Sequence, residues 1–441
     1  MMRHAWGGYE TYAWGQDELN PLAKKGKLGV MGGLGGFSGM GASLVDAMST
    51  LYLMGLHDEF GRAREWVVEN MDFGAQGEQS ISFFETTIRL LGGLLSAHDL
   101  SGDKALLELA EDLGDRLLAV FDGERTGIAT NRAELPMTRV GKEATEDVLI
   151  AEGFSNLIEF GALGIRTGRE EFQLKAEAGA RFLHAKNADT FLLGKAVSRR
   201  TGQTSGGKTI GAPSDSYYEY LLKYWILTGK KDDHWRDRWV NAVDEALDQL
   251  LETTQTGDNL DNVSFIGELF GFEHDKDLIH PSVTHLGCFF PGNIALGVMS
   301  GAVVREKARR YLDFARDQMS ACMLLYSTKT GLGADDGIMD LKKGELHLIS
   351  KKYFQRPGRL FDCDCLDVGA RSRPRAHRYL ALTIARPPQR SLRAYFTSGA
   401  PHTSPFGANT VGTSSKQLRN TAEWTAATSA SATSTRTQSP T

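Results

Sequence analysis

The sequence predicts an all-α fold built from repeated pairs of helices. Three junctions, around Gly102, Gly168 and Gly229, share one pattern: a Ser/Thr-Gly break, an acidic first turn and then an amphipathic stretch. Glycine commonly follows the end of a helix, and acidic residues favour the first turn of the next, so each junction is typical of a helical hairpin. The junctions are 66 and 61 residues apart. A series of helix pairs of this size forms either a solenoid or a closed helical toroid.

The helix expected over residues 103–121 illustrates the pattern. Leu106, Leu113 and Leu117 recur at helical spacing and form an apolar stripe on one face. Alternating segments rich in Val and Ile are scarce, so strands are not predicted as main elements. Seven helix pairs would need about 430 residues, close to the 441 of this chain.

Composition excludes two classes of function. The chain is 41% hydrophobic and 24% charged, with a net charge of −5, so it has no electrostatic footprint for nucleic acid. No apolar run is long enough to span a membrane. The first twenty residues lack the apolar core of a signal peptide. We therefore expect either a cytosolic protein or a chain that begins downstream of its targeting sequence.

The chain changes composition near Pro357. Residues 1–356 hold 39 Lys and Arg against 51 Asp and Glu, whereas residues 357–441 hold 11 basic residues and only four acidic ones. The helical periodicity ends there, and such a polar composition buries too little apolar surface to offset the entropy of ordering. We expect a helical domain over 1–357 and a disordered Arg-, Pro-, Ser- and Thr-rich tail over 358–441. The tail is either a basic interaction arm or a segment translated in the wrong reading frame.

Four cysteines are too few for a disulfide scaffold and lack zinc-finger spacing; they are Cys288, Cys322, Cys363 and Cys365. Cys288 and Cys322 lie 34 residues apart in apolar surroundings. From these residues alone, buried free thiols and a bridge both remain open.

Glu85 is a polar residue set in the apolar run ISFFETTIRLLGGLL. A carboxylate beside Phe83 and Phe84 is partly removed from water, which favours the protonated form that a general acid needs. Arg89 lies one turn later on the same helical face. An ordinary surface Glu–Arg pair is the alternative.

Asp215 and Glu219 lie one turn apart among tyrosines in GAPSDSYYEYLLKYW. Aromatic faces stack on pyranose rings, and paired carboxylates transfer protons at a glycosidic bond, so the pattern suits a sugar site. The alternative is a helix start, with Ser214 or Asp215 as its N-cap.

Two later segments carry further candidates. His285, in THLGCFFPGNIALG, is either a satisfied core histidine or a residue that the Pro-Gly turn places at the rim of the helices. The acids of TGLGADDG, which include Asp335, suit a hard cation, but the segment lacks the spacing of an EF-hand. A solvated loop is the alternative there.

Taken together and in this order, these segments resemble the class I α-1,2-mannosidases, glycoside hydrolase family 47, from about His4 to Pro357. Two more segments carry the resemblance, HAWGGYETYAWGQDELNPL and GASLVDAMSTLYLMGLHDEF. It implies an (α/α)7 barrel, here incomplete at its C-terminal end, which removes α-1,2-linked mannose with inversion and uses one Ca²⁺. The implied partners are high-mannose N-glycans and glycoproteins of the secretory pathway, in the endoplasmic reticulum or Golgi lumen or outside the cell.

The resemblance gives the candidates their roles. Glu85 falls on the proposed general acid, Arg89 on a substrate-binding arginine and Asp215 on a catalytic aspartate. Asp335 stands where a catalytic glutamate is usual. We assign substrate contacts, from the resemblance or from the tyrosine-lined face, to Glu152, Glu219, His285 and Arg356.

Three further residues are interpreted through the resemblance. Cys288 and Cys322 match a disulfide found across much of the family, which favours a bridge over free thiols. Pro213 stands where the endoplasmic-reticulum enzymes carry arginine, which favours a Golgi-like or secreted fungal specificity.

The resemblance breaks off after Pro357. Gly358 replaces the glutamate proposed as general base, and the segment with the calcium-binding threonine is absent, so no metal ligand is assigned in this chain. We therefore expect an impaired α-1,2-mannosidase. The alternatives are a mannose-glycan-binding protein of the degradation-lectin type and a product that does not fold stably.

Overall fold

The computed structural model describes residues 1–28, 40–74, 79–135, 139–140, 144–255, 262–269 and 279–349. The chain divides into two compact units, Met1–Ala381 and Leu382–Thr441, and every described residue belongs to the first. The predicted tail, residues 358–441, lies outside the described residues. Its disorder and the domain boundary at Pro357 therefore stay predictions.

Helices are the main elements among the described residues, as the sequence predicts. Helix α1 (Met2–Ala13) is followed, within the described residues, by five helix pairs whose members pack on each other. These are α2 (Ala42–Leu53) with α3 (His57–Asn70), α5 (Gly92–Ser101) with α6 (Lys104–Leu117), α8 (Leu157–Thr167) with α9 (Glu170–Lys186), α10 (Asp215–Leu227) with α11 (Asp233–Gln249), and α12 (Phe290–Ser300) with α13 (Arg305–Leu324).

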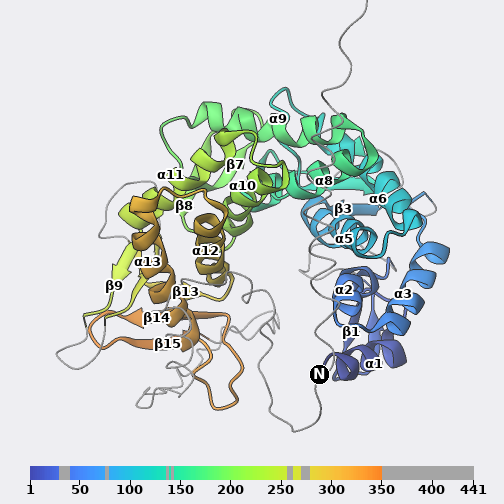
Figure 1. Ribbon diagram of the computed structural model, residues 1–441, viewed down its shortest axis with the longest axis horizontal. Coiled ribbons are helices and arrows are strands. Elements are labelled where there is room, and N and C mark those ends of the chain that lie inside the picture. The colour runs from blue at the N-terminus through green and yellow to red at the C-terminus, as the bar shows by residue number, and fades with distance from the viewer. Residues whose placement is uncertain are drawn as a thin grey trace, which may run out of the picture. The chain divides into compact units, whose positions relative to one another are not determined.

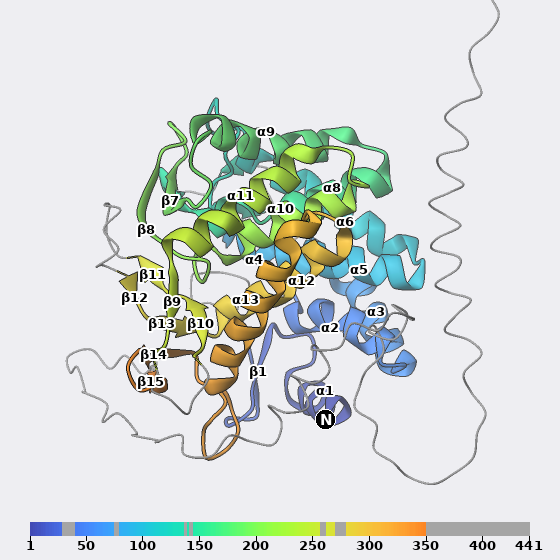
Figure 2. The ribbon, with the colours of Figure 1, turned by 60° about the vertical axis from the view of Figure 1, so that its left-hand side comes forward.

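The first helix of each pair forms an inner layer, in which α2, α5, α8, α10 and α12 each pack on the next. Figure 1 shows the pairs of this unit following one another along a curve from α2 to α12. The second helices lie outside them. There α13 runs beside α11 (Figure 2), and the Tyr311 hydroxyl of α13 donates to Asp244 of α11 at 2.9 Å. No helix in the described ranges is both long and apolar enough to cross a membrane.

The predicted helical hairpins are present at all three junctions. Gly102, Gly168 and Gly229 follow α5, α8 and α10 with φ of 75°, 74° and 73°, values that favour glycine. Asp103 and Asp232 then cap α6 and α11, because their carboxylates accept backbone N–H groups of the first turn.

The helix expected over 103–121 is also confirmed. It forms α6 and a short 3₁₀ turn, η2 (Leu118–Phe121), and the leucines of its apolar stripe are fully buried. Other short helical turns lie between the pairs: α4 (Phe83–Glu85), the π-helix η1 (Thr86–Leu91), α7 (Ile150–Phe154) and η4 (Leu286–Phe289).

Short antiparallel strands occupy the connections between helices, and the sequence did not predict them. The described strands form five sheets: β1 (Glu18–Asn20) with β2 (Lys25–Lys27); β3 (Gln79–Ser82), β4 (Arg132–Leu135) and β5 (Arg139–Val140); β6 (Asp147–Leu149), β7 (Gly194–Ser198), β8 (Thr204–Lys208), β11 (Glu268–Leu269) and β12 (Ile279–His280); β9 (Leu251–Thr253) with β10 (Ser264–Ile266); and β13 (Ser282–Thr284), β14 (Asp336–Asp340) and β15 (Glu345–Ile349). Each is too short for a period-2 pattern to stand out.

Candidate active site

Glu85 and Arg89 lie where the chain enters inner helix α5. Glu85 ends α4, and Arg89 belongs to the π-helix η1 that leads into α5. Such π-helical turns are frequent at functional sites. The Glu85 Oε2 lies 2.6 Å from the Arg89 Nε, and the two side chains are 19% and 28% exposed. The pair is therefore half-buried, which argues against an ordinary surface pair.

Arg89 also contacts a second carboxylate. Its Nη1 lies 3.3 Å from Asp46 Oδ2, on the neighbouring inner helix α2. Arg89 thus joins two acids from elements far apart in the sequence. Asp46 has no predicted role, although it lies in a segment that carries the family resemblance, because nothing local in the sequence marks it as a partner of Arg89.

Glu152 lies in α7, which packs on α4. Burial raises the pKa of Glu152, the guanidinium of Arg132 opposes this, and the negative charge of Glu85 adds to the increase in pKa. Glu85 and Glu152 therefore lie within each other's electrostatic field. A proton is held more readily on Glu152 than on a carboxyl in water.

Asp215 is the first residue of α10 and lies next to α7. The Ala151 N–H donates to the Pro213 carbonyl at 3.1 Å, which joins the segment before α10 to α7. Burial raises the pKa of Asp215, the Ser216 N–H that it accepts at 2.9 Å lowers it, and the charge of Glu219 raises it again. The structure thus brings the predicted Glu85, Glu152 and Asp215 onto three successive contacting elements, α4, α7 and α10.

The predicted helix cap takes a different form. Ser214 occupies the N-cap position, but its hydroxyl accepts no capping bond, and Asp215 accepts from the adjacent Ser216 N–H. Glu219 forms an ion pair with Lys223 at 2.5 Å on the same helix. Its charge still reaches Asp215, so the two carboxylates act on one face of α10 as predicted.

Glu159 is a buried acid that the sequence analysis missed. It lies on inner helix α8, and the Tyr220 hydroxyl donates to its Oε1 at 2.8 Å. Burial raises the pKa of Glu159 to about 7. Its position in the run SNLIEF was the available signal, since a carboxylate between apolar residues is costly to bury.

His285 and Asp335 meet through strand pairing. Thr284 of β13 pairs with Asp336 of β14, and just beyond, the His285 N–H donates to the Asp335 carbonyl at 2.7 Å. Both side chains are exposed, and His285 Nε2 lies 2.7 Å from the Tyr326 hydroxyl. The core-histidine interpretation of His285 is therefore wrong, and the exposed position fits the rim interpretation.

This segment also approaches the one that precedes Asp215. A Cβ on Gly211 would lie 2.8 Å from the Thr284 Oγ1, so only glycine allows this contact. The segment that holds His285 is thus connected, through Thr284, to the residues that lead into α10.

Cys288 of η4 and Cys322 of α13 form a disulfide, with an S–S distance of 2.02 Å. The bridge implied by the resemblance is confirmed. Cys363 and Cys365 lie outside the described residues.

The remaining predictions concern the C-terminal part and the metal. Arg356 and Gly358 lie outside the described residues. Within the ranges that are described, no three His, Cys, Asp or Glu side chains gather as metal ligands. The calcium requirement stays a prediction.

Inner and outer helices in pairs, with carboxylates and an arginine on the neighbouring elements α4, η1 and α7, define a helical-barrel protein with a candidate acid–base site. A model of glycosyl hydrolase family 47 matches residues 1–366, and the chain belongs to this family. The predicted family and barrel class are therefore confirmed.

Similar proteins with known names agree with this family assignment. The endoplasmic reticulum mannosyl-oligosaccharide 1,2-alpha-mannosidase of Rattus norvegicus is 36% identical over 344 residues, 75% of this chain and 48% of that protein. The mannosyl-oligosaccharide 1,2-alpha-mannosidase MNS1 of Arabidopsis thaliana is 37% identical over 342 residues, 76% of this chain and 57% of that protein. The solved alpha-1,2-mannosidase from Trichoderma reesei has a TM-score of 0.65 at 26% identity, covering 78% of this chain and 70% of that one. The chain spans about half the length of the curated relatives it matches.

Proposed function

We propose that this chain carries the glycan pocket of an α-1,2-mannosidase that acts on high-mannose N-glycans, and that it turns substrate over slowly. The observation that carries the proposal is the Arg89 guanidinium held between Glu85 and Asp46, with Glu152 on the adjoining element. The relatives supply the substrate class, because they are named mannosyl-oligosaccharide 1,2-alpha-mannosidases.

In the proposed reaction Glu85 donates a proton to the glycosidic oxygen, and Arg89 orients both Glu85 and the sugar. Asp215 holds or transfers a proton on the other side of the sugar, directly or through water. Inversion requires a water activated opposite the acid by a carboxylate base. Gly358 has no carboxylate to act as this base. General-base catalysis contributes about 10²–10⁴-fold to the rate, so we expect slow turnover. Calcium dependence belongs to the same proposal.

Gly358, in place of the expected glutamate, also favours a second candidate function. This function is the binding of mannose glycans without turnover. A pocket that keeps Glu85, Arg89 and Asp215 retains polar partners for sugar hydroxyls. We place either function in the secretory pathway. The rat relative is named for the endoplasmic reticulum, and the Cys288–Cys322 bridge suits an oxidising compartment. The Golgi-like branch preference expected from Pro213 stays a prediction.

The test measures both turnover and binding on the purified 441-residue chain. Mannose release from α-1,2-mannobiose is followed with calcium and with a chelator, and binding of a high-mannose N-glycan is measured by titration calorimetry. We expect binding with little release. Calcium-dependent release at a rate typical of the family would contradict the impairment, and the absence of both binding and release would contradict the glycan pocket.

A further inference from the structure

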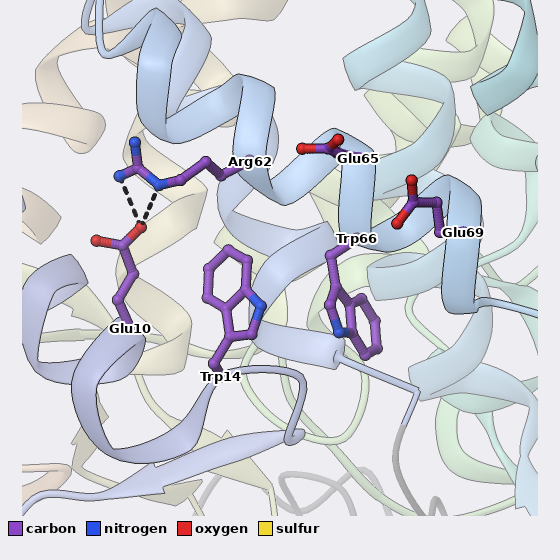
Figure 3. A pocket seen from close by; sticks show the side chains of 6 residues that line it. All are labelled: Glu10, Trp14, Arg62, Glu65, Trp66 and Glu69. Carbon is purple, nitrogen blue, oxygen red and sulfur yellow. Dashed lines mark hydrogen bonds and ion pairs between the residues drawn. The ribbon is translucent and has the colours of Figure 1, made fainter.

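We propose that a pocket between α1 and α3 is a second, non-catalytic carbohydrate site. The pocket measures about 430 Å³ and is lined by Glu10, Trp14, Arg62, Glu65, Trp66 and Glu69 (Figure 3). None of these residues belongs to the candidate active site. The expected ligand is a neutral oligosaccharide whose pyranose rings rest on the two indoles.

The two tryptophans present a platform. Figure 3 shows Trp14 and Trp66 side by side, with both indole nitrogens turned toward the space between the rings. Both side chains are only partly buried. Apolar aromatic faces of this kind stack on the C–H faces of a sugar, and each indole N–H is a donor that a sugar oxygen can accept.

Both rings are held in place without a ligand. Trp14 packs edge-on against Trp6, with ring centroids 6.0 Å apart at 83°. Trp66 fills a notch beside two glycines, because a Cβ on Gly15 or Gly41 would lie 2.8 or 2.6 Å from indole atoms. A platform fixed in advance loses little conformational entropy on binding, which favours affinity for a weakly held ligand.

Charged side chains surround the platform. Arg62 donates from Nε and Nη2 to one oxygen of Glu10, at 2.9 and 2.7 Å. Glu65 and Glu69 lie one turn apart on α3 and are exposed. Carboxylate oxygens accept hydrogen bonds from sugar hydroxyls, so the pocket offers acceptors at its rim and donors between the rings.

An organic cation is the competing ligand, since the pocket lining contains three carboxylates and only one guanidinium. Cation sites usually enclose the charge over ring faces, whereas Trp14 and Trp66 lie side by side in Figure 3. The Arg62 guanidinium is paired with Glu10. The other two carboxylates, Glu65 and Glu69, are exposed, where water and salt screen their attraction for a cation. The neutral saccharide is therefore the better match.

The test uses the full chain and three probes: α-1,2-mannobiose, maltotriose and chitotriose. Binding is followed by titration calorimetry and tryptophan fluorescence. We expect at least one probe to bind, with Trp14→Ala and Trp66→Ala each weakening its binding about tenfold or more. Glu69→Gln should weaken it to a smaller degree. The matched control, Arg89→Ala, removes the arginine assigned to substrate binding in the candidate active site and should leave this binding unchanged.

Glu69→Gln keeps the test decisive if Trp66→Ala does not fold, because Glu69 is exposed and its replacement disturbs no packing. Saccharide binding that is equal in Trp14→Ala, Glu69→Gln and the unchanged chain would overturn the proposal. So would binding of tetramethylammonium, lost in Glu69→Gln, by a chain that binds none of the three sugars. Because Arg89→Ala changes only the candidate active site, failure here is distinguishable from failure of the proposed mannosidase pocket.

Discussion

Glu159 shows how a single buried acid couples the site to stability. Burial raises its pKa to about 7 from an ordinary value of 4.5. Between these values the folded state binds more protons than the unfolded state, so the favourable contribution is complete below pH 4.5 and is lost as the pH rises through 7. The Tyr220 hydroxyl donates to Glu159 and can donate equally to the amide oxygen of a glutamine at this position.

We therefore expect Glu159→Gln to gain stability relative to the unchanged chain as the pH rises. Glutamine cannot ionise, so the difference in free energy of unfolding should grow by about 3 kcal/mol between pH 4.5 and pH 8. Urea unfolding at several pH values measures it. A difference that does not vary with pH would mean that Glu159 ionises alike in both states.

The stability of a variant at Asp215 shows whether this residue is needed for the fold. Because burial raises the pKa of Asp215, its charged form is costly at neutral pH, and that cost vanishes when the group is protonated below its unfolded value. Asn at this position can still accept the Ser216 N–H. We expect Asp215→Asn to be at least as stable as the unchanged chain at pH 7, with the advantage lost near pH 4, by urea unfolding. A marked loss of stability at pH 7 would assign Asp215 to the fold instead.

At the scale of elements, the disulfide ties η4, the turn that leads into α12, to α13. It closes a loop between residues 34 apart in sequence, which stabilises by about 3–4 kcal/mol in the chain-entropy model. Reduction should lower the free energy of unfolding by this order, measured with urea. The control, Cys288→Ala with Cys322→Ala, should be insensitive to reductant. Free alkylation of both thiols in protein from an oxidising compartment would refute the bridge.

Helix pairs were predictable because their signals are local. The Ser/Thr-Gly break and acidic turn identified the hairpins at Gly102, Gly168 and Gly229. Two more hairpins escaped: Gly55 follows a methionine, and Gly301 is separated from the first acidic residue of α13 by an apolar stretch. In both, a glycine with positive φ ends the turn, but one half of the sequence pattern is missing.

Contacts between distant segments were beyond sequence reasoning. Asp46 and Arg89 meet because α2 packs on η1, and Trp14 and Trp66 share a pocket because α1 lies near α3. No spacing along the chain encodes either meeting. Glu85, Asp215 and His285 could be named from their own surroundings or from family motifs, whereas their partners required the packed helices.

At the scale of the whole molecule, the described residues include the candidate acid Glu85, Arg89 and Asp215. Position 358 lies outside the described residues, and the calcium-binding segment expected from the resemblance is absent from the sequence. The proposed function therefore assigns sugar binding to the described residues and activation of water to a residue that the chain lacks at position 358. The sharpest whole-molecule experiment restores the activation of water and leaves sugar binding unchanged.

The chimera for this experiment joins residues 1–357 to the C-terminal segment of a family member that carries the glutamate and the calcium threonine. We expect it to release mannose from α-1,2-mannobiose with inversion and to lose activity in a chelator. A matched chimera with glycine in place of that glutamate should be slower by about 10²–10⁴-fold. Within the active chimera, Glu85→Gln keeps the shape but removes the transferable proton, so kcat should fall about 10²-fold or more while glycan binding persists. Full activity of the Glu85→Gln chimera would overturn the assignment of the acid, and equal activity of the glycine and glutamate chimeras would show that the loss at position 358 does not limit turnover.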